Sequence, residues 1–405
     1  MRSRAFMSLY IAVFVATMGI SMVSPLLPVY AKDLGASGVW LGLTFSVFAI
    51  VQAIFGPFAG KLSDRYGRKP FIVAGLLVYL IAALGYLTAE SFMQVIAFRA
   101  FSGLGTSLIF SVARAYVGDL TPPGHEGRWF GVFATADIIG FGTGPLVAGV
   151  LRQGVGFDAV FVAMASLMAA SMLVVVLWLP WSGHSRGPGE AAPAPTPSAG
   201  FAAALRHRLV IAVTLQQALL SLSFGASFSF LALRLENGLG ASPVLIGVAF
   251  ATQDITGGLA QPLLGRVADR RDRRQLVAVG LLANGALLMA LGFAGSYFAA
   301  VALLMAMGAT GSIASVAASA MQVVAGRRVG MGTVLGLGSA AGGIGIVLGS
   351  VAGGLLVDQF DLWAAFVFGG CALGVGVALF LYLTRGVATS EAADALLTAE
   401  AAAVS

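Results

Sequence analysis

The chain has 405 residues, of which 59% are hydrophobic and only 10% are charged, and its mean hydropathy is +0.94. One globular core cannot bury so many apolar side chains, so the composition excludes a soluble protein and predicts a polytopic membrane protein. The net charge of +6 does not indicate nucleic-acid binding, because the basic residues fall in short clusters between apolar runs. The single cysteine, Cys371, excludes a disulfide and a cysteine-based metal site.

Twelve apolar runs have about the 20-residue length of a helix that crosses the hydrocarbon core of a bilayer. They lie at residues 6–30, 38–59, 70–89, 92–117, 128–153, 157–180, 208–233, 243–264, 275–294, 297–324, 331–356 and 362–384. We therefore expect an all-α membrane protein with twelve transmembrane helices.

The loops between these runs differ in charge. If the N-terminus is cytoplasmic, only Lys32, Arg152 and Arg234 fall outside, whereas the other basic residues fall inside. The positive-inside rule then predicts a multi-pass protein of the inner, or plasma, membrane with both termini in the cytoplasm.

The sequence repeats itself at a constant offset of 205 residues. The tetrapeptide LGAS at 34–37 returns at 239–242, and GKLSDRYGRKP at 60–70 returns in altered form at 265–276. Two parallel halves imply a pseudo-two-fold axis along the membrane normal, with a cavity where they meet. The expected domains are a six-helix bundle over 1–180, a flexible Pro- and Gly-rich cytoplasmic linker over 181–207, a second six-helix bundle over 208–384 and a cytoplasmic tail over 385–405.

The stretch GKLSDRYGRKP follows the second run and concentrates five charges in a weakly charged chain. It matches the loop signature G-x-L-a-D-r-x-G-r-k, and over nearly its whole length the chain resembles the major facilitator superfamily. The resemblance implies a gating loop that stabilises the outward-facing state by contacting the opposite half and an acidic residue that ends helix four. The gating residues are Gly60, Asp64, Arg65, Gly67, Arg68 and Asp119, with Gly265, Asp269 and Arg270 in the second copy.

Residues 56–70 allow two other interpretations. The basic residues could serve only to fix the topology, although that does not explain the glycines and the aspartate. The second copy carries Asp272 where the signature has glycine, which predicts a distorted turn. The segment 56–63 resembles a phosphate-binding loop, but its glycine-to-lysine spacing is one residue short and no Ser or Thr follows the lysine. We therefore expect no nucleotide.

Arg99 lies inside the fourth run and begins RAFSGLGTS, which is similar to the helix-four signature of the family, with Ser102 in place of the usual glutamine. The resemblance implies a part in proton transfer. Tuning of a nearby carboxylate, binding of an anionic substrate and simple neutralisation of a buried charge are the alternatives.

The fifth run contains GVFATADIIGFGTGPLVAG, which matches the antiporter signature of the family at Gly131, Gly140, Gly144, Pro145 and Gly149. Small residues at four-residue steps form a groove for close approach of another helix, and proline permits a bend. The resemblance implies that this neighbour is helix eight. Ordinary glycine-mediated packing is the alternative.

Asp137 and Asp254 lie near the middle of the fifth and eighth runs, where an unpaired charge is costly and marks a functional site. If these helices are neighbours, both carboxylates can face one cavity and exchange protons during transport. A structural or substrate-binding role is the alternative. Four glutamines are candidate polar groups of the same cavity: Gln52, Gln216, Gln217 and Gln253.

The first run is similar to the corresponding helix of the twelve-span drug:proton antiporters, with Gly19, Pro25 and Pro28 in place. The resemblance implies a secondary active transporter, not an enzyme. We expect proton-coupled efflux of small amphipathic or hydrophobic compounds by alternating access. A dedicated exporter of one metabolite, sugar or lipid and a non-transporting membrane sensor are the alternatives. The expected partners are a small-molecule substrate, protons and the lipid bilayer, without nucleic acid, nucleotide, metal or cofactor, and the expected state is a monomer.

Overall fold

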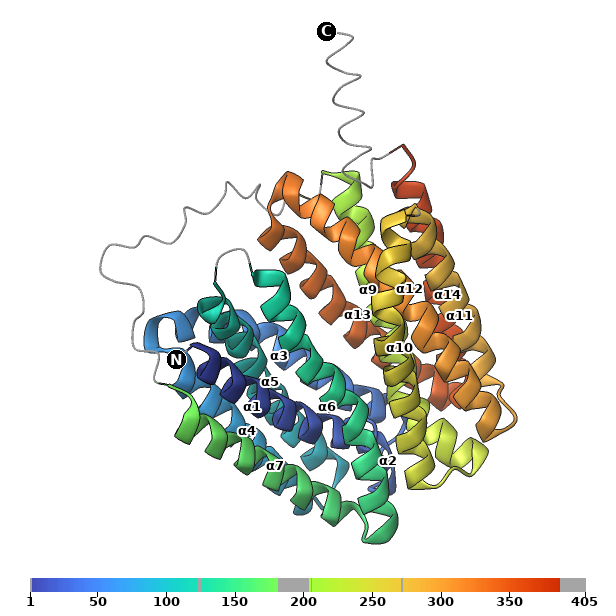
Figure 1. The fold of residues 1–405 in the computed structure, drawn as a ribbon. Coiled ribbons are helices and arrows are strands. Elements are labelled where there is room, and N and C mark those ends of the chain that lie inside the picture. The colour runs from blue at the N-terminus through green and yellow to red at the C-terminus, as the bar shows by residue number, and fades with distance from the viewer. Residues whose placement is uncertain (1, 123–124, 181–203, 205, 271, 387–405) are drawn as a thin grey trace.

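The computed structural model describes residues 2–122, 125–180, 204, 206–270 and 272–386 (Figure 1). Nearly all of the expected linker 181–207 and tail 385–405 therefore lies outside the described residues. The helices are α1 (Arg2–Val23), α2 (Leu27–Asp33), α3 (Gly38–Tyr66), α4 (Arg68–Leu87), α5 (Phe92–Leu120), α6 (Glu126–Gly154), α7 (Phe157–Trp178), α9 (Arg208–Leu233), the π-helix η1 (Arg234–Gly238), α10 (Pro243–Arg270), α11 (Arg273–Gly292), α12 (Tyr297–Val329), α13 (Met331–Gln359) and α14 (Leu362–Leu383).

Twelve spans in the described residues are long and apolar enough to cross a membrane, which confirms the predicted fold class. The first span consists of α1 and α2, because the chain turns at 24–26, around Pro25. A proline disfavours the helical conformation of the residue before it, which explains the break.

Several helices extend well beyond the apolar runs. Helix α3 continues to Tyr66 and α12 continues to Val329, past the expected ends at 59 and 324. Polar and charged residues can occupy these turns because they project beyond the hydrocarbon layer while the backbone hydrogen bonds continue.

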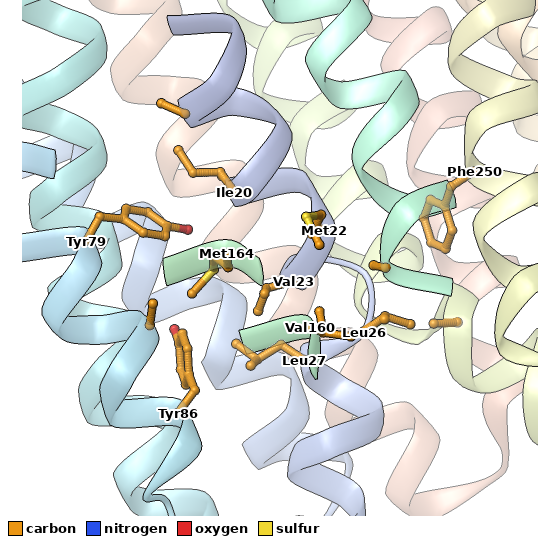
Figure 2. Close-up of a cluster of buried hydrophobic side chains, with 14 of the residues drawn as sticks. Ile20, Met22, Val23, Leu26, Leu27, Tyr79, Tyr86, Val160, Met164 and Phe250 are labelled. Carbon is orange, nitrogen blue, oxygen red and sulfur yellow. The ribbon is translucent and has the colours of Figure 1, made fainter. Parts of the chain in front are cut away.

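The helices form two groups, α1 to α7 and α9 to α14, which converge at one end and splay apart toward the end that carries both termini (Figure 1). The groups meet mainly along two seams, α3 against α13 and α6 against α10. Figure 2 shows the interior of the first group, where Tyr79, Tyr86 and Met164 pack below α1. Such tight packing makes each group a coherent unit.

The 205-residue repeat also holds in the structure. Helices α4, α6 and α7 begin and end at positions that return in α11, α13 and α14. Lys69 donates to the carbonyl oxygens of Val176 and Leu179 at the end of α7, at 2.8 and 2.7 Å. Arg274, its counterpart, donates to the carbonyl oxygen of Leu381 in α14 at 2.7 Å. The same clamp thus caps the last helix of each half.

Candidate functional site

A chamber of about 540 Å³ lies among α6, α9, α10, α11, α12 and α14. Its polar lining consists of Asp137, Ser223, Ser227, Gln253, Asp254, Gln261, Asn284, Ser312 and Ser315. Phenylalanines 141, 224, 228 and 366 supply much of the apolar wall. None of the described lining residues carries a positive charge, so the chamber combines an apolar wall with two carboxylates.

Asp137 is half-buried in α6, and its Oδ1 accepts a hydrogen bond from the Thr17 hydroxyl of α1 at 3.1 Å. Arg114 of α5 is the cation close enough to interact favourably with this carboxylate. The N-terminal half thus supplies one carboxylate that is held in place on one side and reaches the chamber on the other.

Asp254 lies on α10 and is exposed to the chamber. No hydrogen bond or ion pair to its carboxylate occurs among the described residues. A carboxylate without a fixed partner is free to bind a proton or a ligand. The two aspartates therefore reach one chamber from different halves.

Of the four glutamines predicted to line the cavity, Gln253 does so. The others do not line this chamber. Gln216 is buried, and both polar atoms of its amide lack a hydrogen-bond partner. Gln217 donates to the Ser221 hydroxyl at 3.3 Å, and Gln52 is half-buried in α3.

Arg99 does not line the chamber either. Its side chain is 1% exposed in the core of the first half, with the guanidinium carbon 4.2 Å from the ring centre of Phe48 and 5.4 Å from that of Phe45. Its Nη2 donates to the Ser24 hydroxyl at 3.4 Å, whereas Nε and Nη1 lack a hydrogen-bond partner.

The antiporter-signature glycines meet a different helix from the one expected. A Cβ on Gly140 or Gly144 would collide with α1, at Thr17 and at Ser21 respectively, and not with α10. The Ser21 hydroxyl also donates to the Gly140 carbonyl at 2.9 Å. The prediction that this groove receives helix eight is therefore wrong, because a stripe of small residues does not specify its partner.

The end of the same signature does face the eighth membrane span, which is α10. Gly149 packs against the backbone of Pro243, and the carbonyl of Pro145 lies where a side chain on Gly247 would be. Gly131, at the start of the signature, has no atom close to the position of a Cβ. The signature thus packs α6 against α1 at Gly140 and Gly144 and against α10 at Pro145 and Gly149.

The loop at 60–70 forms a compact polar cluster within the first half. Arg68 pairs with Asp64 at 2.5 Å and with Asp119 at 2.9 Å, and its Nη1 donates to the Ser63 hydroxyl at 2.7 Å. Gly67 adopts φ of +93°, a conformation that favours glycine. Gly60 accepts from Arg68 through its carbonyl at 3.4 Å, and Arg65 is exposed.

The second copy of the loop differs in its turn. Asp272 has φ of −60° and caps α11 by accepting from the Arg274 amide at 3.0 Å, where the first copy has the left-handed Gly67. Gly265, Asp269 and Arg270 belong to α10, but their side chains lie outside the part that the structure describes.

Polar contacts seal the end where the halves converge. Asp358 of α13 accepts from the amides of Gly38 and Val39 in α3, at 2.6 and 3.0 Å. Arg152 of α6 forms a two-pronged ion pair with Glu236 of η1, at 2.6 and 2.9 Å. The chamber is therefore closed at this end.

Several polar chamber residues, Asn284 among them, are not candidates in the sequence analysis. Asn284 of α11 lines the chamber and donates to the Met307 carbonyl at 3.0 Å. Its position as the one amide near the middle of a long apolar run could have indicated it.

Comparison with known proteins supports the assignment of the chain to a family of membrane transporters. The sequence profile of the Major Facilitator Superfamily matches residues 9–233 and 213–401. The quinolone resistance protein NorA of Staphylococcus aureus is 25% identical over 292 residues, which cover 72% of this chain and 74% of NorA. An uncharacterized MFS-type transporter of Methanocaldococcus jannaschii is 30% identical over 164 residues, or 40% of this chain and 42% of that protein.

Two solved structures share the fold. A bacterial homolog of the human lysosomal transporter Spinster, in an inward-facing and unoccupied conformation, gives a TM-score of 0.79 at 17% identity over 95% of this chain and 97% of that one. The human organic anion transporter MFSD10 gives a TM-score of 0.65 at 20% identity over 94% and 99%. At these identities the likeness concerns the fold alone.

Proposed function

Because the chain belongs to the Major Facilitator Superfamily of membrane transporters, we propose that it exports small amphipathic or hydrophobic compounds in exchange for protons. The two halves alternate in exposing the chamber to either side of the membrane. The conformation described above, closed at one end and splayed at the end with the termini, is then the inward-facing state.

One observation carries this proposal: Asp137 and Asp254, from different halves, line the same chamber, and none of its described lining residues is a cation. A carboxylate in a poorly hydrated site favours its protonated form, and it ionises when water or a cation reaches it. Movement of the halves changes both conditions, so proton binding and substrate binding can be linked to the same motion.

The chamber walls favour apolar ligands of varied shape. Phe224 stacks on Phe228 at 4.7 Å between ring centres, and Met307 adds a flexible side chain. Aromatic and methionine surfaces adapt to different ligands, and the carboxylates favour those that carry a positive charge. The proposal of an exporter with varied substrates agrees with the similarity to NorA, which is named as a quinolone resistance protein.

A dedicated exporter of one metabolite, sugar or lipid is the second candidate. The amides of Gln253, Gln261 and Asn284 favour it, because several hydrogen-bonding groups in one wall suit a hydroxylated ligand. A non-transporting sensor is disfavoured by the two carboxylates, which a sensor would not need at membrane depth.

The test is transport by the full-length protein in proteoliposomes under an imposed pH gradient. Hydrophobic dyes, biocides, sugars and lysolipids are offered in turn, and proton flux is recorded. We expect dyes or biocides to evoke proton flux, and we expect Asp137→Asn or Asp254→Asn to abolish uphill transport while exchange of substrate across the membrane continues.

Asp158→Asn is the matched control, since Asp158 is exposed at the start of α7 and lies away from the chamber. It should leave uphill transport unchanged. Unimpaired uphill transport by both chamber variants would defeat the proton-coupling proposal, and flux with sugars or lysolipids alone would favour the dedicated exporter.

A further inference from the structure

The chamber is one-sided, although the chain is a repeat. Apart from Asp137, Ile138 and Phe141 of α6, every described residue that lines it belongs to the C-terminal half. The 205-residue repeat assigns a counterpart in the N-terminal half to each of these lining residues. The counterparts show what the first half holds in place of a chamber.

Those counterparts are larger or aromatic at several key positions. Gln253, Asn284 and Leu291 correspond to Phe48, Tyr79 and Tyr86. Leu304, at the chamber wall, corresponds to Arg99. Phe366 corresponds to Phe161, and Ser227 corresponds to Met22. At Phe48, Tyr79, Tyr86, Arg99 and Met22 the first half thus carries a larger side chain than the chamber wall does, although other counterparts, such as Gly19 for Phe224, are smaller.

In the structure the aromatic counterparts cluster around Arg99, and Tyr86 packs on Phe161 with 5.4 Å between ring centres. The Arg99 guanidinium lies 4.2 Å from the ring centre of Phe48 and beside the hydroxyls of Tyr79 and Tyr86. Tyr79 and Tyr86 are 0% exposed, and the Tyr86 hydroxyl shares a 2.9 Å hydrogen bond with Ser102. Figure 2 shows both tyrosines directed into the packed interior of this half. The space equivalent to the chamber is therefore filled.

Arg99 is the central group of this filling. It is 1% exposed, two of its guanidinium nitrogens lack a hydrogen-bond partner, and no ion pair to it occurs among the described residues. Its charge is balanced by the faces of Phe45 and Phe48 and by hydroxyl groups. The Arg99 side chain thus fills a space that corresponds to part of the chamber in the C-terminal half.

We propose that most of the substrate-recognising surface lies in the C-terminal half because Arg99 fills the equivalent space in the N-terminal half, which adds only residues of α6 to the described lining. Leu304 is then the specificity-determining position, since its shorter apolar side chain leaves space in the C-terminal half where Arg99 fills the N-terminal half. This inference rests on the proposed transport function, which supplies the substrate. The N-terminal half contributes Asp137, Ile138 and Phe141 to the chamber and otherwise moves as a rigid body.

The first experiment needs no substrate. In full-length protein carrying Cys371→Ser, a single cysteine is introduced by Ser227→Cys in the chamber or by Met22→Cys at the equivalent position. Both are treated with ethylammonium methanethiosulfonate, a small thiol reagent. Because a close-packed interior excludes the reagent, we expect Ser227→Cys to react at least about tenfold faster than Met22→Cys. Equal rates overturn the inference.

Two further variants test the pair of positions. Leu304→Arg should slow the reaction of Ser227→Cys at least about tenfold, since it brings the filling side chain into the chamber. Arg99→Leu should accelerate the reaction of Met22→Cys, and Arg99→Met repeats this test with a longer side chain if the leucine variant does not fold. Unchanged rates in all of these variants overturn the assignment.

Transport separates this inference from the proposed function. Leu304→Arg should abolish proton-driven transport of every compound that the wild-type protein carries, and retained transport would overturn the role of Leu304. If the wild-type protein carries none of the compounds, the proposed function fails while the labelling ratio still decides whether the chamber is one-sided.

Discussion

The two seams between the halves are built on the same backbone plan but sealed with different chemistry. Gly42 packs on Ser350 across the α3–α13 seam, and Gly247 packs on Pro145 across the α6–α10 seam, at positions related by the 205-residue repeat. Asp358 accepts two amide hydrogen bonds from α3, whereas its counterpart Gln153 accepts one from Val244, at 3.4 Å.

The two seams differ in hydrogen bonding because one of them lacks a backbone N–H donor. Gly38 offers an amide N–H to Asp358, but the residue at the equivalent position of α10 is Pro243, which has none. A carboxylate at the start of a helix also benefits from the helix dipole, which a neutral amide exploits less. The α6–α10 seam instead carries the Arg152–Glu236 ion pair nearby. Duplication thus conserved the packing while each seam acquired its own polar lock.

The shared packing gives the largest expected effect. Gly42→Val and Gly247→Val each force a side chain into facing backbone, and overpacking of this kind costs about 3 kcal/mol. Both variants should therefore open the converged end to a similar extent. Distances between spin labels at positions 37 and 360, and at 155 and 237, measure this opening.

The control for these variants is Gly154→Ala, because a Cβ at Gly154 meets no other atom. It should leave both label distances unchanged. If the two valine variants differed widely, the two seams would not be equivalent in packing.

Removal of the charged cap should separate the two seams. Asp358→Ala deletes two charge-assisted hydrogen bonds, which together stabilise the closed end by about 2 kcal/mol. The distance between labels at 37 and 360 should increase, while that between 155 and 237 changes less. An equal increase at both pairs would show that the cap does not act on its own seam.

The ion pair should give a smaller effect at the other seam. Glu236→Gln weakens a partly exposed pair worth about 1 kcal/mol, so the distance between labels at 155 and 237 should increase modestly. The exchange of charges in the double variant Arg152→Glu/Glu236→Arg should restore the closed distance. Failure of this rescue would assign the effect of Glu236→Gln to packing.

The weakest contact should give the smallest effect. Gln153→Ala removes one long hydrogen bond and should cost about 0.5 kcal/mol. Gln153→Glu sharpens the comparison, since Pro243 cannot donate and a carboxylate there gains at most one amide partner. If this variant closed the seam as strongly as Asp358 does, the proline argument would be wrong.

The sequence predicts most of the fold because membrane spans and repeats are written locally. Length, apolar character and a constant offset identify twelve spans in two halves. The depth of Asp137 and Asp254 within their runs pointed to a shared cavity, and the structure places both on one chamber.

The remaining features depend on which helix meets which. Gly140 and Gly144 form a groove, but only the packing shows that α1 fills it. The partner of Arg152 lies 84 residues away, and the partners of Asp358 lie 319 and 320 residues away. Gln216 and Arg99 look alike in the sequence as polar residues in apolar runs, and neither lines the chamber.

Lys69 and Arg274 tie the last helix of each half back to the third helix of the same half. Neither clamp crosses between the halves. Each provides a hydrogen-bond donor for carbonyl oxygens at the end of a helix, which have no donor within the helix. A polypeptide severed between α7 and α9 would leave both fragments with capped ends. The covalent connection is then dispensable for assembly, and two co-expressed fragments should reconstitute one working transporter.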